Sequence, residues 1–133
     1  MKIIQDIAIK YKLYIIEDSC EAHGAEYHGK FVGQFGDMAT FSYYIAHLVC
    51  CGEGGMVSTN NEKIADLLQS VKSHGRKPGS LYFDHLRFGL NFKLNDLEAS
   101  VGLPQIEDFW KTFNKRKENL YYLLKKTKDL KRF

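Results

Sequence analysis

Residues 13–21, LYIIEDSCE, place a cluster of polar side chains directly after a short apolar run. The run at 13–16 is unbroken and rich in β-branched and aromatic residues, which is typical of a strand buried on both faces, as in a parallel sheet. The polar cluster at 17–21 follows the carboxyl end of this strand. Open α/β sheets hold their ligands just beyond such strand ends, so the stretch predicts a site as well as a strand.

The segments around this stretch continue an α/β pattern. Apolar residues at helical spacing predict a helix over 3–12, and further strands are expected at 39–43 and 56–59. Glycines between the first two strands indicate a looped connection over 24–37, with a turn at 26–30. A Gly-rich loop at 52–55 precedes the third strand.

A helix is expected over 61–74. Asn60 or Asn61 supplies its cap, and Gly75 is expected to be the residue that ends it. Its buried stripe is predicted to consist of Ile64, Leu67, Leu68 and Val71.

A long helix is expected over 95–126. Asn95 and Glu98 form an Asn-x-x-Glu capping pattern at its start. Pro104 removes a backbone donor within it and should kink or split it. The order of elements is that of an α/β fold, but only three good strands are present, so the sheet should be incomplete.

Composition excludes several classes of protein. The 133 residues allow one hydrophobic core, and 44% hydrophobic content with 2 prolines excludes disorder. No apolar run approaches the roughly 20 residues that span a bilayer, and 3 cysteines, two of them adjacent, fit a reducing compartment. We therefore expect a cytoplasmic protein without a membrane partner.

The net charge of +3 is unevenly distributed. Residues 111–133 carry 9 Lys/Arg against 2 acidic residues, whereas residues 1–110 carry 10 against 14. A basic terminal helix could meet nucleic acid or an acidic partner, but a solvated helix face is the simpler interpretation, and no nucleic-acid partner is expected. The histidines at 23, 28, 74 and 85 lack the spacing of metal ligands, so no metal site is expected.

Three short clusters could share one site. These are the carboxylates Glu17 and Asp18, the segment 42–47 and the glycine loop 52–55. Singly, each has an ordinary structural interpretation as a cap, a core segment or a tight turn. Together they place an acid, a hydroxyl, an imidazole and a flexible loop on successive connections of one sheet, which suits a phosphorylated cofactor.

Five segments carry a resemblance to a known family. The chain resembles the DegT/DnrJ/EryC1/StrS family of pyridoxal-phosphate sugar enzymes, over nearly its whole length and in the family's order. The segments are IEDSCEAHGA at 16–25, GQFGD at 33–37, FSYYIAH at 41–47, GEGGMVSTN at 52–60 and GLNFKLNDLEA at 89–99.

The resemblance implies a fold and a set of domain boundaries. The fold is the aspartate aminotransferase-like fold type I of pyridoxal-phosphate enzymes. Residues 1–133 would form a single partial domain, the carboxyl-terminal part of the cofactor-binding large domain. The helix at 95–126 would lead toward a small domain that family members have and this sequence lacks.

The resemblance also implies cofactor contacts. Asp18 matches the carboxylate that pairs with the pyridine nitrogen, and Glu21 stands where many members have Gln beside the ring hydroxyl. Ser42 matches a hydroxyl that binds the cofactor phosphate. Asn91 matches a residue that reaches the phosphate of the neighbouring subunit's site, which implies a homodimer.

Residue 47 departs from the aminotransferase pattern, which has Lys there. An imidazole cannot form a Schiff base, so His47 excludes covalent anchoring of the cofactor at this position. Members with His here are similar to 3-dehydratases of deoxysugar synthesis, which bind pyridoxamine phosphate noncovalently and use the His as a base. Imidazole changes protonation near neutral pH, as this role requires.

Three functions remain open at this point. The resemblance implies a pyridoxal- or pyridoxamine-phosphate-dependent enzyme acting on a nucleotide-linked keto sugar, in polysaccharide or deoxysugar biosynthesis. His47 favours 3-dehydration, and sugar transamination is the alternative. A noncatalytic module that keeps the fold and the dimer surface is the third. We expect the 133 residues alone to be weakly active or inactive.

Overall fold

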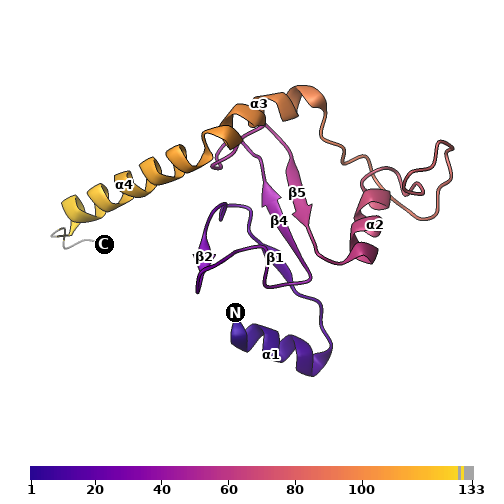
Figure 1. Cartoon of the computed structure of the whole chain (residues 1–133), viewed down its shortest axis with the longest axis horizontal. Helices are drawn as coiled ribbons and strands as arrows, with labels where there is room; N and C mark the ends of the chain where they lie inside the picture. The colour runs from indigo at the N-terminus through magenta and orange to yellow at the C-terminus, as the bar shows by residue number, and fades with distance from the viewer. Residues whose placement is uncertain (129, 131–133) are drawn as a thin grey trace.

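The central sheet contains three strands in the order β1–β4–β5 (Figure 1). The computed structural model describes residues 1–128 and 130; part of the basic segment predicted at 111–133 therefore lies outside the described residues. Strand β1, Ile16–Asp18, runs parallel to β4, Met38–Ser42, and β4 runs antiparallel to β5, Gly55–Ser58. The α/β architecture and the parallel pairing of the first strand are confirmed.

Strand β1 begins later than the prediction of 13–16. The backbone of Ile15 is already tied to Asp37, whose carboxylate accepts the Ile15 N–H at 2.8 Å and whose own N–H donates to the Ile15 carbonyl at 2.9 Å. Burial on both faces was also wrong, because Leu13 and Ile16 are 58% and 61% exposed. Within the described residues, the main contacts between elements are strand pairs, so no helix covers this strand.

The N-terminal helix α1 spans Lys2–Tyr11, which confirms the helix predicted at 3–12. Lys12 ends it in the left-handed region, with φ of 55°. The turn predicted at 26–30 is a hairpin in which β2, Glu26–Tyr27, pairs with β3, Lys30–Phe31. Its two loop residues, His28 and Gly29, have φ of 51° and 72°, the pattern of a type I′ turn.

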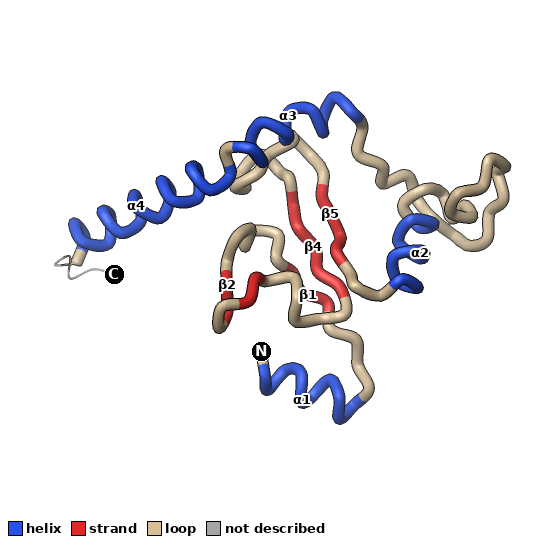
Figure 2. The backbone as a smooth tube through the Cα atoms, viewed as in Figure 1, coloured by secondary structure: helices blue, strands red, loops and turns tan. Residues whose placement is uncertain are grey.

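Helix α2 spans Glu62–Val71 and begins at the expected cap (Figure 2). The Asn61 carboxamide oxygen accepts the N–H groups of Lys63 and Ile64. The helix ends three residues before the predicted His74. The predicted stripe is only partly buried, since Leu67 is 46% exposed.

Gly75 lies beyond Lys72, the residue that ends α2, but its N–H still donates to the Ser70 carbonyl of the helix at 2.8 Å, and a glycine is needed there for a second reason. A Cβ at Gly75 would clash with the Arg87 carbonyl oxygen, and one at Gly89 would clash with the Gly75 nitrogen. Two backbone segments pass so close to each other at these glycines that neither position has room for a side chain. The residues between them form a loop whose ends meet, stabilised by the His74 N–H donating to the Leu90 carbonyl at 2.9 Å.

The predicted long helix is divided into α3, Asp96–Glu107, and α4, Phe109–Thr127. Its cap is confirmed: the Asn95 oxygen accepts the Glu98 N–H, and the Asn95 amide donates to the Glu98 carboxylate, both at 2.9 Å. The break expected from Pro104 occurs four residues later, at Asp108, where ψ is 9°. Figure 1 shows the two helices as one arm that passes the end of β4.

Few side chains are buried in the described part of the chain. The buried apolar residues are Ala8, Ala39, Val49 and Cys51. Large apolar side chains on α1, α3 and α4 are exposed, such as Ile9 at 78% and Leu97 at 82%. None of the described helices combines the length and the apolar character needed to span a membrane.

Candidate functional site

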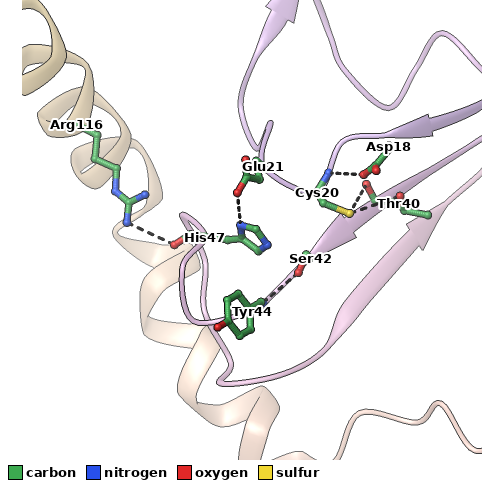
Figure 3. A network of polar contacts seen from close by, with 8 residues as sticks. All are labelled: Asp18, Cys20, Glu21, Thr40, Ser42, Tyr44, His47 and Arg116. Atoms are coloured by element: carbon green, nitrogen blue, oxygen red, sulfur yellow. Dashed lines mark hydrogen bonds and ion pairs between the residues drawn. The ribbon is translucent and has the colours of Figure 1, made fainter.

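The parallel pair β1 and β4 brings the predicted polar residues to one edge of the sheet. Asp18 is paired in register with Thr40, and Ser42 follows two residues later at the end of β4. The next connection carries His47. Figure 3 shows Asp18, Ser42 and His47 around one region, with Glu21 next to the imidazole. This placement is consistent with a shared site for Asp18, Ser42 and His47.

Asp18 is an exposed carboxylate held by its own turn. The Cys20 N–H donates to Asp18 Oδ1 at 3.3 Å. Hydrogen bonds from the thiol and the N–H of Cys20 lower the pKa of Asp18 below its ordinary value, so the carboxylate stays ionised. Cys20 in turn lies beside Thr40, with 3.7 Å between its sulfur and the Thr40 hydroxyl.

Cys20 is a protonated thiol next to Asp18. Its hydrogen bond to Asp18 raises the pKa of the thiol, and the nearby carboxylate charges act in the same direction. A thiol that stays protonated is a poor nucleophile. Cys20 is therefore a hydrogen-bond donor to Asp18 rather than a reactive group.

Ser42 presents a free hydroxyl proton at the strand end. Its Oγ accepts the Tyr44 N–H at 3.2 Å, which orients the side chain. Within the described residues this contact uses only an acceptor site of the hydroxyl, so its O–H can donate elsewhere. A phosphate oxygen is a suitable acceptor for that proton.

His47 is paired with a carboxylate. Its Nδ1 lies 3.7 Å from Glu21 Oε1, with the His47 side chain 11% exposed and that of Glu21 84% exposed. The ring of Tyr44 packs edge-on against the imidazole, with 5.9 Å between ring centroids. A carboxylate near Nδ1 favours the tautomer with a proton there and leaves Nε2 with its lone pair.

The glycine loop lies at the base of the segment that carries His47. The Cys51 N–H donates to the Tyr43 carbonyl at 2.8 Å, and the Tyr43 N–H donates to the Gly54 carbonyl at 2.9 Å. Gly54 has φ of 129°, and a Cβ there would lie 2.8 Å from the Leu94 side chain. The loop at 52–55 thus closes the His47 connection and returns the chain to β5.

Glu17 does not belong to the site, contrary to the predicted carboxylate pair. Its carboxylate accepts three backbone N–H groups, from Gly33, Phe35 and Gly36, at 2.6 to 2.7 Å. Successive side chains of a strand point to opposite faces. This alternation separates Glu17 from Asp18 and could have been used to distinguish them in the sequence.

Asn91 lies apart from these residues. It pairs with Ser73 in an isolated antiparallel bridge and makes no hydrogen bond to Asp18, Ser42 or His47 among the described residues. Its predicted role concerns the site of a neighbouring subunit. That role stays a prediction.

His23 is a further polar residue beside the site that the motifs did not single out as functional. Its ring lies 5.3 Å from that of Phe41 and 6.0 Å from that of Tyr43. Both ring nitrogens are buried and have no hydrogen-bond partner among the described residues. Burial lowers the pKa of His23, and the charge of His47 lowers it further, so the imidazole is held neutral.

The fold and the strand-end site define the class of the protein. The parallel strands β1 and β4 end in an ionised carboxylate and a hydroxyl. The α/β unit that contains them matches part of the pyridoxal-phosphate-dependent aminotransferases. The aminotransferase PseC of Helicobacter pylori superposes with a TM-score of 0.87 and 30% identity, over 96% of this chain and 34% of its own.

Residues 1–133 match the DegT/DnrJ/EryC1/StrS aminotransferase family, and the chain belongs to it. GDP-perosamine synthase of Caulobacter vibrioides is 36% identical over 78% of this chain and 28% of its own length. The dTDP-4-dehydro-2,6-dideoxy-D-glucose 3-dehydratase of Saccharopolyspora spinosa is 33% identical over 77% of this chain and 28% of its own length. The chain thus spans about a third of the proteins it matches.

Proposed function

We propose that this chain carries the cofactor-binding part of an enzyme that uses pyridoxamine or pyridoxal phosphate to modify a nucleotide-linked keto sugar, by 3-dehydration. The observation that carries the proposal is the imidazole of His47, next to the Glu21 carboxylate and close to Asp18 and Ser42 at the strand ends. The family includes both transaminases and 3-dehydratases, as the names of its relatives state.

The residues present fit a noncovalently bound pyridine cofactor. The ionised carboxylate of Asp18 suits a protonated ring nitrogen, and the free hydroxyl proton of Ser42 suits a phosphate. In this proposal Glu21 acts on the cofactor through His47, whose Nδ1 lies 3.7 Å from its carboxylate. When bound, such a cofactor supplies an electron sink for the reacting carbon.

His47 acts as the base in this proposal. The Glu21 carboxylate near Nδ1 favours a proton there, so in this proposal Nε2 accepts a proton from the bound cofactor or substrate and can return it. The His47 side chain is only 11% exposed, which restricts water around the ring, whereas the Glu21 side chain is 84% exposed. Mutating Glu21 should therefore affect the proton transfer more than cofactor binding.

Transamination is the second candidate, since the family is described as aminotransferases. It needs a primary amine that holds the cofactor between half-reactions, and residue 47 cannot supply one. The nucleotide-sugar substrate and a homodimer with Asn91 serving the second site are part of the proposal. They are supported by the relatives' names and by the exposed position of Asn91.

Binding of pyridoxamine phosphate tests the proposal. This compound is fluorescent and carries an amine, so it cannot attach to the surface lysines of the chain. We expect saturable quenching by the wild-type chain, a large loss of affinity in Asp18→Asn, and no loss in Asp6→Asn on helix α1. Absence of binding to the wild type would favour a noncatalytic module.

Borohydride reduction with pyridoxal phosphate separates the two catalytic alternatives. Peptide mapping by mass spectrometry should find no adduct at residue 47 in the wild type, because imidazole forms none. Any turnover of a 4-keto sugar nucleotide with pyridoxamine phosphate, which we expect to be weak for these residues alone, should change the cofactor spectrum with loss of the 3-hydroxyl. Formation of a 4-amino sugar from an amino donor instead would establish transamination and overturn the dehydratase proposal.

A further inference from the structure

The segment that carries His47 depends on tertiary contacts for its shape. It runs from the end of β4 to the glycine loop without regular helix or strand, and one turn bond joins the His47 N–H to the Tyr44 carbonyl at 3.0 Å. Its base is closed at Tyr43 and Cys51, as described above. The backbone of its far side must find partners elsewhere, because unpaired buried peptide groups are costly.

Gln105 of helix α3 supplies those partners. Its Oε1 accepts the Cys50 N–H at 2.9 Å, and its Nε2 donates to the Cys50 carbonyl at 2.6 Å. The same amide nitrogen donates to the Val101 carbonyl at 2.9 Å within α3, which orients the side chain. The Gln105 amide thus pairs with both the N–H and the carbonyl of Cys50, as the backbone of a neighbouring β-strand would. The two residues are 55 positions apart in the sequence.

Two further contacts link the same segment to the helical arm. A Cβ at Gly102, one turn before Gln105, would clash with the Cys51 sulfur, so α3 approaches the segment as closely as a glycine permits. Arg116 of α4 donates to the His47 carbonyl at 3.4 Å (Figure 3). Of these contacts, the one between Gln105 and Cys50 has two short hydrogen bonds, so we expect it to hold the segment most firmly.

We propose that Gln105 is a positioning residue for His47: its amide clamps the Cys50 backbone and so fixes the segment that presents the imidazole to Glu21. The proposal rests on the proposed function only for the role of His47 as the base. The clamp itself requires an amide of this length. Glu cannot donate to the Cys50 carbonyl, and Leu can form neither bond.

The accessibility of His47 tests the clamp without any cofactor. Diethyl pyrocarbonate modifies neutral imidazole, and peptide mapping gives the rate at each histidine separately. In Gln105→Glu and Gln105→Leu we expect His47, 11% exposed in the structure, to react several-fold faster. The exposed His28 serves as internal reference and should react at its wild-type rate. Gln69→Glu, the same change on the exposed side of α2, should leave both rates unchanged.

A compensating pair keeps the test decisive if the Gln105 variants unfold. Gly102→Ala should push the Cys51 side chain and accelerate modification of His47, and the double variant Gly102→Ala/Cys51→Ala should return the rate toward the wild-type value. Far-ultraviolet circular dichroism establishes that each variant is folded. An unchanged His47 rate in folded Gln105 and Gly102 variants would overturn the proposal. Because no cofactor is present, that result would leave the proposed function standing.

Discussion

Neighbouring acidic residues at the end of β1 have separate tasks. Glu17 binds the backbone of the loop at 33–36 through three short hydrogen bonds, and Asp18 faces the site with its charge maintained by Cys20. The motif predicted that Asp18 is functional, but it placed Glu17 in the same cluster. The difference lies in the alternation of strand side chains, which separates adjacent residues onto opposite faces.

Glu17→Gln should lower the free energy of unfolding by about 2 kcal/mol, because charge-assisted hydrogen bonds are lost and the amide turns a donor toward a donor. Urea unfolding followed by circular dichroism measures the change. Glu53→Gln, at an exposed position of the glycine loop, should have no comparable effect. Equal stability of the Glu17 variant and the wild type would show that the three bonds contribute little.

His23 should make stability depend on pH. Burial lowers the pKa of its folded form below the ordinary 6.5, so the unfolded chain takes up the proton more readily. The stability contributed by neutral His23 is therefore complete above pH 6.5 and is lost as the pH falls through the lowered pKa. Between pH 7.5 and 5, the free energy of unfolding should therefore change less with pH in His23→Phe than in the wild type.

The matched control for His23 is His28→Asn. His28 is exposed and has a positive φ, which Asn tolerates. This variant should keep the pH dependence of the wild type. Identical pH profiles for His23→Phe and the wild type would contradict a neutral, buried His23.

His47→Lys should allow covalent attachment of pyridoxal phosphate at residue 47. The lysine amine would occupy the region between Glu21 and Ser42 where the imidazole now lies. Borohydride reduction followed by peptide mapping should then locate the adduct at this position, in contrast to the wild type. A variant that binds the cofactor yet yields no adduct there would count against the site.

At the scale of elements, local chemistry made several features predictable. The caps at Asn61 and Asn95 and the hairpin turn at 28–29 depend on residues within a few positions of one another, so the sequence contains their whole cause. The start of β1 depends on Asp37, so it was predicted wrongly, and the crowding of Gly75 by Arg87 could not be predicted from the residues next to Gly75. The Gln105 clamp spans 55 positions, and no local pattern indicates it.

Gly75→Ala should be severely destabilising. The new Cβ would meet the Arg87 carbonyl, and φ of 74° disfavours any side chain. We expect a loss of about 3 kcal/mol or more in the free energy of unfolding, from strain and displaced backbone. Gly29→Ala offers the control, because it has similar φ and open space around it, so its loss should be much smaller.

At the scale of the whole molecule, the described helices leave apolar side chains uncovered. Ile9, Leu97 and Phe88 are 78%, 82% and 86% exposed. Exposure of this extent is unusual for a monomeric chain and is typical of surfaces that meet other protein. The sequence indicated an incomplete sheet, since a parallel sheet that is covered on both faces normally has more than three strands.

The chain alone should therefore bind the apolar dye 8-anilinonaphthalene-1-sulfonate under native conditions. Fluorescence measured without denaturant should exceed the signal of the free dye strongly and should fall when the chain unfolds in urea. Leu97→Lys/Phe88→Lys should reduce it while the circular dichroism spectrum stays unchanged. Dye fluorescence at the level of buffer would mean that these side chains are covered in solution.

The crossing at Gly75 and Gly89 also affects how related chains can differ in length. The two ends of the 76–88 loop meet at a fixed point, and the Lys77 N–H donates to the Asp84 carbonyl at 2.9 Å; residues added or removed beyond that bond, within 78–83, therefore change mainly the entropy of closing the loop, which grows slowly with the number of residues. The sheet and α2 lie outside the closed loop and keep their positions. Insertions and deletions can therefore accumulate at this part of the surface without disturbing the strand ends where Asp18 and His47 lie.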